Sequence, residues 1–317
     1  MQVNKFCQIL LIKVKGIISG ISGFVGTNIN KYLSHIENYE IDSFDKQNCN
    51  KNISFSCEVQ FFIHLAGKAH DLKNASSPDE YYKVNTELTK VIFDAFLVSK
   101  AKVFITLSSV KAVADQIVEV LTEEQIPNPI THYGKSKLLA EEYILSQTIP
   151  DGKRVYILRP CMIHGPGNKG NLNLLFNIAS KGFPWPLGDF DNKRSFCSIE
   201  NLCFIINELI EREDIPSGVY NVADDVPLST NDVIRLIAES KGMVARIFDV
   251  NKSFISSLAR LGDLLGLPLN TERLHKLTES YIVSNDKIRK VLGKPLPVSS
   301  RDGLMRTFES FSTIYQY

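Results

Sequence analysis

The sequence of 317 residues lacks the features that mark several functional classes. Its net charge is only +1, so charge gives no reason to expect binding to nucleic acid or to an anionic membrane surface. No apolar run approaches the roughly 20 residues of a membrane-spanning helix. The six cysteines form no C-x-x-C pair, so we expect reduced packing residues in a cytoplasmic protein rather than a zinc site or disulfides.

The composition is that of a globular protein with one large core. Hydrophobic residues make up 44% of the chain and charged residues 22%, which is an ordinary balance. A chain of this length can bury one α/β core and carry a smaller lobe. Residues 1–12 are mildly apolar but lack the apolar core and cleavage site of a signal peptide, so we expect an extension ahead of the first strand.

A glycine-rich turn lies near the start of the chain. Residues 15–19 predict a buried strand and residues 27–33 a helix, which is the context that a dinucleotide-binding turn requires. The spacing is G-x-x-G-x-x-G rather than G-x-G-x-x-G, and a simple strand-to-helix turn is the alternative. In a binding turn the helix N-terminus would face a pyrophosphate. The cofactor-binding residues predicted here are Gly20, Gly23, Phe24, Val25 and Gly26.

A carboxylate follows the second predicted strand, residues 39–44. Asp45 lies where the adenosine ribose of a bound dinucleotide should be, and it would accept hydrogen bonds from ribose hydroxyls and repel a 2′-phosphate. Asp45 therefore favours NAD. Lys46 could instead attract the phosphate of NADP, and Asp45 could simply end a strand, so both cofactors stay open. Residues 46–58 are too few for the usual strand, helix and return, and adenine contacts cannot be predicted there.

Tyr133 and Lys137 are four residues apart on a predicted helix and project from one face. Ionising a tyrosine at neutral pH costs roughly 4 kcal/mol, because its ordinary pKa is near ~10. An ammonium at about 4 Å, at an effective dielectric of about 20, offsets roughly that amount. The pair is therefore a candidate acid/base device, although the same spacing also occurs on solvated helix faces.

Two serines follow the predicted strand of residues 103–107. Ligands of open α/β sheets bind outside the carboxyl ends of the strands, so Ser108 and Ser109 could hydrogen-bond a substrate oxygen there. The residue types alone leave either serine open.

These motifs, in their order along the chain, resemble the extended short-chain dehydrogenase/reductases of the NAD-dependent epimerase/dehydratase family, which act on nucleotide sugars. The resemblance covers nearly the whole chain. It implies a Rossmann-type, doubly wound parallel α/β sheet with a smaller interleaved C-terminal substrate lobe. The nucleotide-binding domain would span residues 13–165 with a return at 195–224, and the lobe residues 166–194 and 225–317. The segments that carry the resemblance are the glycine turn, His64–Gly67, Val84–Asn85, Leu107–Ser109, Tyr133-x-x-x-Lys137, Arg159–Pro160, Gly165–Gly167 and Arg194–Phe196.

The resemblance also implies site residues. It makes Ser109 the catalytic serine and leaves Ser108 to satisfy local backbone groups. Asn85 would steady the backbone near the nicotinamide, and Arg194 would clamp the diphosphate of the substrate, although a helix-surface amide and a salt bridge are the alternatives. The implied catalytic residues are Ser109, Tyr133 and Lys137. The further cofactor-binding residues are Leu65, Ala66, Gly67, Asn85 and Pro160, and the substrate-binding residues are Ser109, Asn171, Arg194 and Arg273, of which Arg273 is the weaker clamp and could be a solvated helix residue.

The reaction is less well determined. Dehydratases that resemble this chain carry Asp-Glu after the catalytic hydroxyl residue, whereas Val110 and Lys111 stand here, so dehydration is not expected. The sequence at residues 108–111 and in later segments resembles that of UDP-4-keto-6-deoxy-hexosamine 4-reductases. A UDP-sugar 4-epimerase with tightly bound NAD, a steroid-type dehydrogenase and a non-catalytic dinucleotide sensor are the alternatives. By the same resemblance we expect a homodimer packed through helices near residues 79–100 and 133–147.

Overall fold

The computed structural model describes residues 13–36, 38–44, 58–68, 77–168, 170–266 and 269–314. The predicted extension of residues 1–12 and Asp45 therefore lie outside the described residues, as does the shortened segment that follows Asp45.

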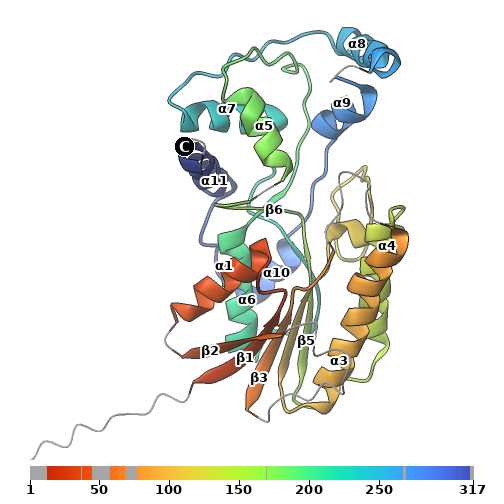
Figure 1. Ribbon diagram of the computed structural model, residues 1–317, viewed down its shortest axis with the longest axis vertical. Coiled ribbons are helices and arrows are strands. Elements are labelled where there is room, and N and C mark those ends of the chain that lie inside the picture. The colour runs from red at the N-terminus through yellow and green to blue at the C-terminus, as the bar shows by residue number, and fades with distance from the viewer. Residues whose placement is uncertain are drawn as a thin grey trace, which may run out of the picture.

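A six-stranded sheet forms the centre of the molecule (Figure 1), and all of its pairings are parallel. The strand order is β2-β1-β3-β4-β5-β8, so the chain runs to one side of β1 and then returns to its other side at β3. This reversal is the switch point at which open α/β sheets bind ligands. The α/β, doubly wound prediction is confirmed. The strands are β1 (Val14–Ser19), β2 (Tyr39–Phe44), β3 (Val59–His64), β4 (Val103–Leu107), β5 (Arg154–Pro160) and β8 (Gly218–Val222).

Helices cover both faces of this sheet (Figure 1). α1 (Phe24–Ser34) and α6 (Ile199–Glu211) lie on one face, and α3 (Leu88–Val98) and α4 (His132–Ser146) lie on the other. The single helix predicted for residues 79–100 is a helical run of three parts. A π-helical segment, η2 (Tyr82–Glu87), separates α2 (Pro78–Tyr81) from α3. Such π-helical turns occur often at functional sites, and this one carries Asn85.

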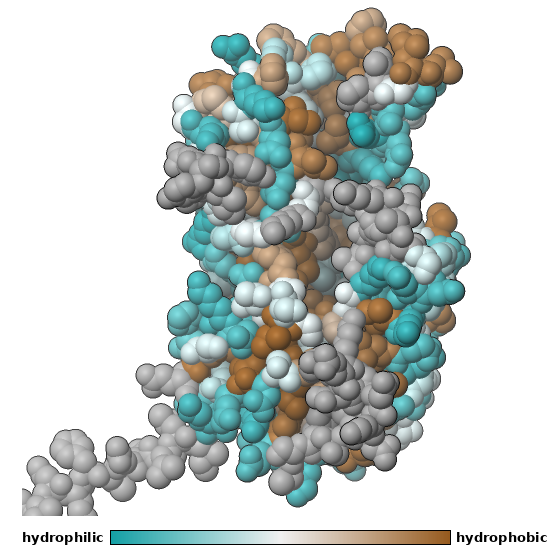
Figure 2. Space-filling model, in the orientation of Figure 1, coloured by the Kyte–Doolittle hydropathy of each residue, from teal (hydrophilic) through white to brown (hydrophobic). Residues whose placement is uncertain are grey.

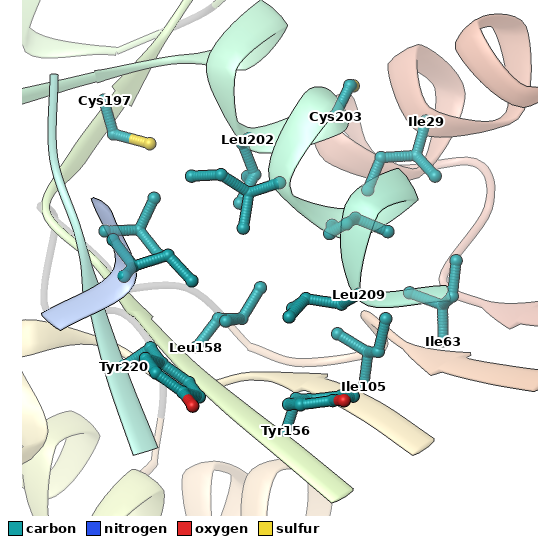
Figure 3. Close-up of a cluster of buried hydrophobic side chains, with 14 of the residues drawn as sticks. Ile29, Ile63, Ile105, Tyr156, Leu158, Cys197, Leu202, Cys203, Leu209 and Tyr220 are labelled. Carbon is teal, nitrogen blue, oxygen red and sulfur yellow. The ribbon is translucent and has the colours of Figure 1, made fainter. Parts of the chain in front are cut away.

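The largest core cluster lies between the sheet and the α1/α6 face (Figure 3). Strand residues such as Ile63, Ile105 and Leu158 meet Leu202 and Leu209 of α6, and all five side chains are almost fully buried. A second cluster on the opposite face packs phenylalanines of β3, β4 and α3. Residues buried on both faces explain why these strands read as continuous apolar runs in the sequence.

A smaller lobe stands at the carboxyl ends of the strands (Figure 1) and has its own apolar core. Its helix α7 (Thr230–Ser240) is capped at its N-terminus by Ser229, which forms a capping box with Asp232. α10 (Asp286–Leu292) contributes Ile288 to the core of the sheet rather than to the lobe. The division into two domains stays a prediction. Other elements in this part of the molecule are β6 (Met162–His164), α5 (Asn171–Ala179), β7 (Phe196–Ser198), α8 (Lys252–Leu265), α9 (Thr271–Thr278) and α11 (Ser300–Ile314).

A buried histidine joins the lobe to the sheet. His164 Nδ1 lies 3.0 Å from Thr307 Oγ1 of α11, and its Nε2 lies 3.3 Å from Asp224 Oδ2 just after β8. Asp224 also accepts hydrogen bonds from Ser198 N and Asn201 Nδ2. A buried carboxylate needs such partners, so this group fixes the lobe on the sheet.

The three cysteines that the structure describes are buried packing residues. Burial raises the pKa of the thiols of Cys161, Cys197 and Cys203 above the ordinary value, so each stays neutral. The packing role is confirmed for these three, and the other cysteines lie outside the described residues.

The surface shown in Figure 2 is apolar at the end of the molecule formed by α8. Phe254, Leu258, Leu261, Leu264 and Leu265 of this helix are exposed. In the part of the chain that the structure describes, no helix has the length and apolar character needed to cross a membrane.

A buried ion pair fixes α4 against β5. Arg159 Nε donates to both carboxylate oxygens of Glu141 at 3.0 Å, and both side chains are almost fully buried. Removing one partner of a buried pair leaves an uncompensated charge, so we expect Glu141→Ala to lower the free energy of unfolding by about 3–5 kcal/mol. Urea denaturation measures this change. The matched control is Glu142→Ala at the exposed neighbouring position, which should change it by less than about 0.5 kcal/mol. A loss below about 1 kcal/mol for Glu141→Ala would contradict the importance of the pair.

Candidate active site

The glycine turn packs directly on the segment that follows β3. Gly20 has a φ of 73°, and a Cβ built on it would lie 2.7 Å from Ala66 N. A Cβ on Gly26 would lie 2.3 Å from Gly20 O, so α1 begins close against the turn. Only glycine fits either position, because the first requires a left-handed backbone and both require close backbone contact.

The N-terminus of α1 can hold an anion. Gly23 is its N-cap, and none of the described side chains caps the helix or places an acidic group in its first turn. A Cβ on Gly23 would approach only Gly20 O, at 3.3 Å. The first backbone N–H groups of a helix lack intrahelical acceptors and carry partial positive charge. Uncapped N–H groups beside a glycine are what a dinucleotide pyrophosphate requires, so these residues fit the cofactor.

A buried histidine network shapes the next turn. Ser19 Oγ accepts hydrogen bonds from the backbone N–H groups of Leu65 and Ala66, so its proton goes to His64 Nδ1 at 2.7 Å. The Thr89 hydroxyl donates to the carbonyl of Asn85 and accepts from His64 Nε2 at 2.9 Å. Burial lowers the pKa of His64 to about 3, with a further contribution from the charge of Lys137. His64 is therefore a neutral, structural residue that carries its proton on Nε2.

Asn85 holds the backbone beside Gly67, as the resemblance implied. Its Oδ1 accepts from Lys68 N at 2.7 Å, and its Nδ2 donates to Lys68 O and to Ser136 Oγ. A Cβ on Gly67 would lie 3.2 Å from Asn85 Oδ1 and 3.1 Å from Lys137 Nζ. The turn after β3 thus contacts both the glycine turn and α4. Asn85 is buried, so the alternative of a helix-surface amide is wrong.

The turn after β4 docks on the N-terminus of α4. Asp115 accepts hydrogen bonds from the backbone of Ile130 and Thr131, and Thr131 caps α4 through Gly134 N. This docking brings Ser109 and Tyr133 together although they are far apart in sequence. They form a hydrogen bond that lowers the pKa of Tyr133.

The phenol of Tyr133 is held protonated. Burial raises the pKa of Tyr133, and this effect outweighs the opposing hydrogen bond from Ser109. Burial also lowers the pKa of Lys137 to about 8, while the charge of Glu141 acts in the opposite direction. Lys137 Nζ donates to the carbonyl of Leu107 at 2.8 Å. Desolvation is thus the largest effect on the pKa of Tyr133, and the expectation that Lys137 favours the phenolate stays a prediction.

Ser108 differs from its expected role. Its backbone N–H donates to Leu158 O, but its Oγ is buried and has no hydrogen-bond partner among the described residues. The expectation that its side chain satisfies local backbone groups is wrong. Ser108 borders a cavity of about 10 Å³ that Asn85 and Lys137 also line. Ser109, in contrast, accepts a hydrogen bond from Lys111 N at 3.2 Å in addition to contacting Tyr133.

The predicted substrate residues lie in the lobe and at its junction with the sheet. Arg194 is partly buried and pairs with Glu279 at 2.9 Å. Arg273 is exposed on α9, as its alternative reading as a solvated helix residue predicted. Asn171 begins α5, and its side chain lies outside the described part of the structure. Pro160 is buried at the end of β5.

Sequence reasoning missed residues that support the site from a distance. Tyr281 Oη donates to Ala114 O at 2.6 Å and lies 3.3 Å from Val110 O, so it supports the turn that carries Ser109. Lys111 lies over the Tyr281 ring, 4.2 Å from its centroid. No motif or local spacing indicates these contacts, because Tyr281 is about 170 residues from Val110 in sequence.

Several known proteins have sequences or folds similar to those of this chain. The chain is 28% identical to the UDP-glucose 4-epimerase of Vibrio cholerae over 93% of this chain and 94% of that protein. It is 26% identical to the GDP-6-deoxy-D-mannose reductase of Pseudomonas aeruginosa, over 70% of this chain and 78% of that protein. Its fold matches the UDP-N-acetylglucosamine 4-epimerase of Bacillus cereus with a TM-score of 0.72 and 18% identity, over 96% of this chain and all of that one. The structure of RMD from Pseudomonas aeruginosa complexed with NADPH also matches, with a TM-score of 0.72 and 21% identity over 95% and 100% of the two chains.

The family model described as the NAD dependent epimerase/dehydratase family matches residues 17–223, which include the glycine turn, Ser109, Tyr133 and Lys137. The chain therefore belongs to the NAD dependent epimerase/dehydratase family.

Proposed function

We propose that this chain is a nucleotide-sugar oxidoreductase that reduces the 4-keto group of a UDP-4-keto-6-deoxy-(N-acetyl)hexosamine. The observation that carries the proposal is the contact of a protonated Tyr133 with Ser109 at the carboxyl ends of the strands, beside Lys137. A phenol that keeps its proton at neutral pH is suited to donate it to a ketone oxygen.

In this proposal the chain supplies position and a proton, while the nicotinamide of a bound NAD(P) supplies the hydride. Ser109 would orient the C4 oxygen of the sugar and Tyr133 would protonate it. Lys137 would hold the nicotinamide ribose, and Asn85 would fix the backbone near Gly67. The backbone N–H groups at Gly23, Phe24 and Val25 would bind the pyrophosphate. Leu65, Ala66 and Pro160 would complete the cofactor contacts.

Arg194 supports a diphosphate substrate, because a guanidinium can bind two phosphate oxygens through its planar fork. Asn171 and Arg273 are further candidates for contacts to the nucleotide part. The relatives that act on sugars linked to UDP or GDP support the same substrate class. The proposal includes both NAD and NADP as the cofactor, since Asp45 lies outside the described residues.

A UDP-sugar 4-epimerase is the second candidate function. It is favoured by the relative from Vibrio cholerae, which is matched over nearly its whole length. The same residues would act in both directions on one sugar, with NAD retained between the two half-reactions. The Ser109, Tyr133 and Lys137 constellation speaks against a non-catalytic sensor, since such a protein has no need for it.

An assay with a panel of UDP- and dTDP-sugars, including 4-keto-6-deoxy forms, tests the function. We expect net oxidation of NADH or NADPH, followed by absorbance, with a 4-keto-6-deoxy sugar. Inversion of a sugar without net change in the cofactor would instead establish the epimerase. Turnover of neither kind with any member of the panel would contradict both assignments.

The role of Tyr133 is tested by Tyr133→Phe, which removes only the hydroxyl. We expect turnover to fall by about 10²- to 10⁴-fold, because positioned proton transfer contributes this much. The thermal unfolding midpoint should stay close to that of the unaltered protein. The control is Tyr82→Phe, which removes the hydroxyl of a half-buried tyrosine that lies 3.1 Å from His132 Nδ1, and this variant should keep its activity. Full activity of Tyr133→Phe would refute the proton-transfer role.

We further propose that the protein is a cytoplasmic homodimer that packs through α3 and α4. These helices expose Val91 and Val98 of α3 and Leu139 and Leu145 of α4. Sedimentation velocity should report a dimer at micromolar concentration, and Leu139→Lys combined with Val98→Lys should shift it to a monomer. A monomer for the unaltered protein would contradict this arrangement.

A further inference from the structure

Backbone contacts place Arg194 and Glu279 side by side. Arg194 exchanges two backbone hydrogen bonds with Leu228, at 2.9 and 2.8 Å. On its other side, Ser195 N donates to Tyr281 O and Tyr281 N donates to Lys193 O. The segment that carries Arg194 is therefore held between two neighbours, and its side chain lies next to the end of α9.

Glu279 accepts two hydrogen bonds from the guanidinium of Arg194. Arg194 Nη2 donates to Glu279 Oε1 at 2.9 Å, and Arg194 Nε donates to the backbone carbonyl of Glu279 at 3.2 Å. Both side chains are only about one-fifth exposed, at 21% and 20%. Partial burial weakens solvent screening, so this pair interacts more strongly than an exposed one.

Glu279 lies close to several basic side chains. It is the C-cap of α9. Its second oxygen, Oε2, lies 2.9 Å from His275 Nδ1. The charge of Glu279 also raises the pKa of Lys111, which burial lowers. Glu279 thus stands among Arg194, Lys111 and His275, where an anionic ligand would also be attracted.

We propose that Glu279 is a specificity-determining residue that competes with the substrate for Arg194. This inference rests on the proposed diphosphate-binding role of Arg194. Glu279 contacts the Nε and Nη2 side of the guanidinium, so a ligand that binds this side of Arg194 must displace the Glu279 carboxylate. A diphosphate carries at least two negative charges, so it can replace the single charge of Glu279 on Arg194. A neutral ligand, such as a sterol, cannot do so and gains nothing at this position.

The competition has a measurable consequence for the nucleotide part alone. Replacing Glu279 with glutamine keeps the side-chain length and leaves the backbone carbonyl that accepts from Arg194 Nε. The neutral amide holds the guanidinium less strongly than the carboxylate does. Arg194 therefore becomes easier for a diphosphate to engage.

The test is a calorimetric titration of the full chain with UDP. We expect Glu279→Gln to bind UDP about tenfold more tightly than the unaltered protein, a change of about 1.4 kcal/mol. Glu279→Met, which also removes the charge, should tighten binding in the same direction. The matched control is Glu272→Gln, an exposed glutamate of α9 that pairs with Lys276, and it should leave UDP affinity unchanged. Unchanged or weaker UDP binding by both Glu279 variants would overturn the inference.

A double-mutant cycle separates this inference from the proposed function. Arg194→Ala should weaken UDP binding at least tenfold, and adding Glu279→Gln to Arg194→Ala should restore little of it. If Arg194→Ala weakens binding but Glu279→Gln has the same effect with and without Arg194, the competition for Arg194 is refuted while the diphosphate site stands. If Arg194→Ala leaves UDP affinity unchanged, the diphosphate role of Arg194 and the inference fall together.

Discussion

One face of α4 determines the geometry of the candidate site. Tyr133, Lys137 and Glu141 are spaced by four residues and therefore lie in a row along the helix. Tyr133 contacts Ser109 after β4, and Lys137 contacts the Leu107 carbonyl at the end of β4. Glu141 pairs with Arg159 of β5. The buried ion pair of Glu141 and Arg159 positions the helix, and the two polar contacts nearer its N-terminus follow from that position. Rotation or translation of α4 would separate the phenol from Ser109 and would also break the contact of Lys137 with the Leu107 carbonyl.

Burial sets the protonation states in this site more strongly than the pairing of charges does. The phenol of Tyr133 and the ammonium of Lys137 both lose solvent, and desolvation favours the neutral form of each. His64 responds in the same way and stays neutral within its hydrogen-bond network. At neutral pH the phenol and His64 are therefore neutral, whereas Lys137, with a pKa of about 8, keeps its charge. A second group of charged side chains lies around Arg194, Lys111 and Glu279, where we propose that the nucleotide part of a substrate binds.

The lobe and the sheet are joined by polar contacts on both sides of this charged region. His164 and Asp224 connect α11 to the end of β8, while Tyr281 reaches from the segment after α9 to the turn that carries Ser109. Tyr281 is two residues from Glu279. Tyr281, which supports the turn that carries Ser109, and Glu279, which pairs with Arg194, therefore lie on one short segment. This segment would support both the reacting end and the nucleotide end of the proposed site.

The sequence by itself determined the fold class, the family and the three candidate catalytic residues. Apolar patterns are local, so the strands β2 and β4 could be predicted with their observed bounds. Motif order then identified Ser109, Tyr133 and Lys137. Only the tertiary structure showed that Ser108 leaves its hydroxyl without a partner among the described residues, that burial keeps Tyr133 protonated, and that Glu279 occupies Arg194. These properties depend on desolvation and on contacts between residues far apart in the chain, such as the 85 positions between Arg194 and Glu279, and local spacing carries no information about either.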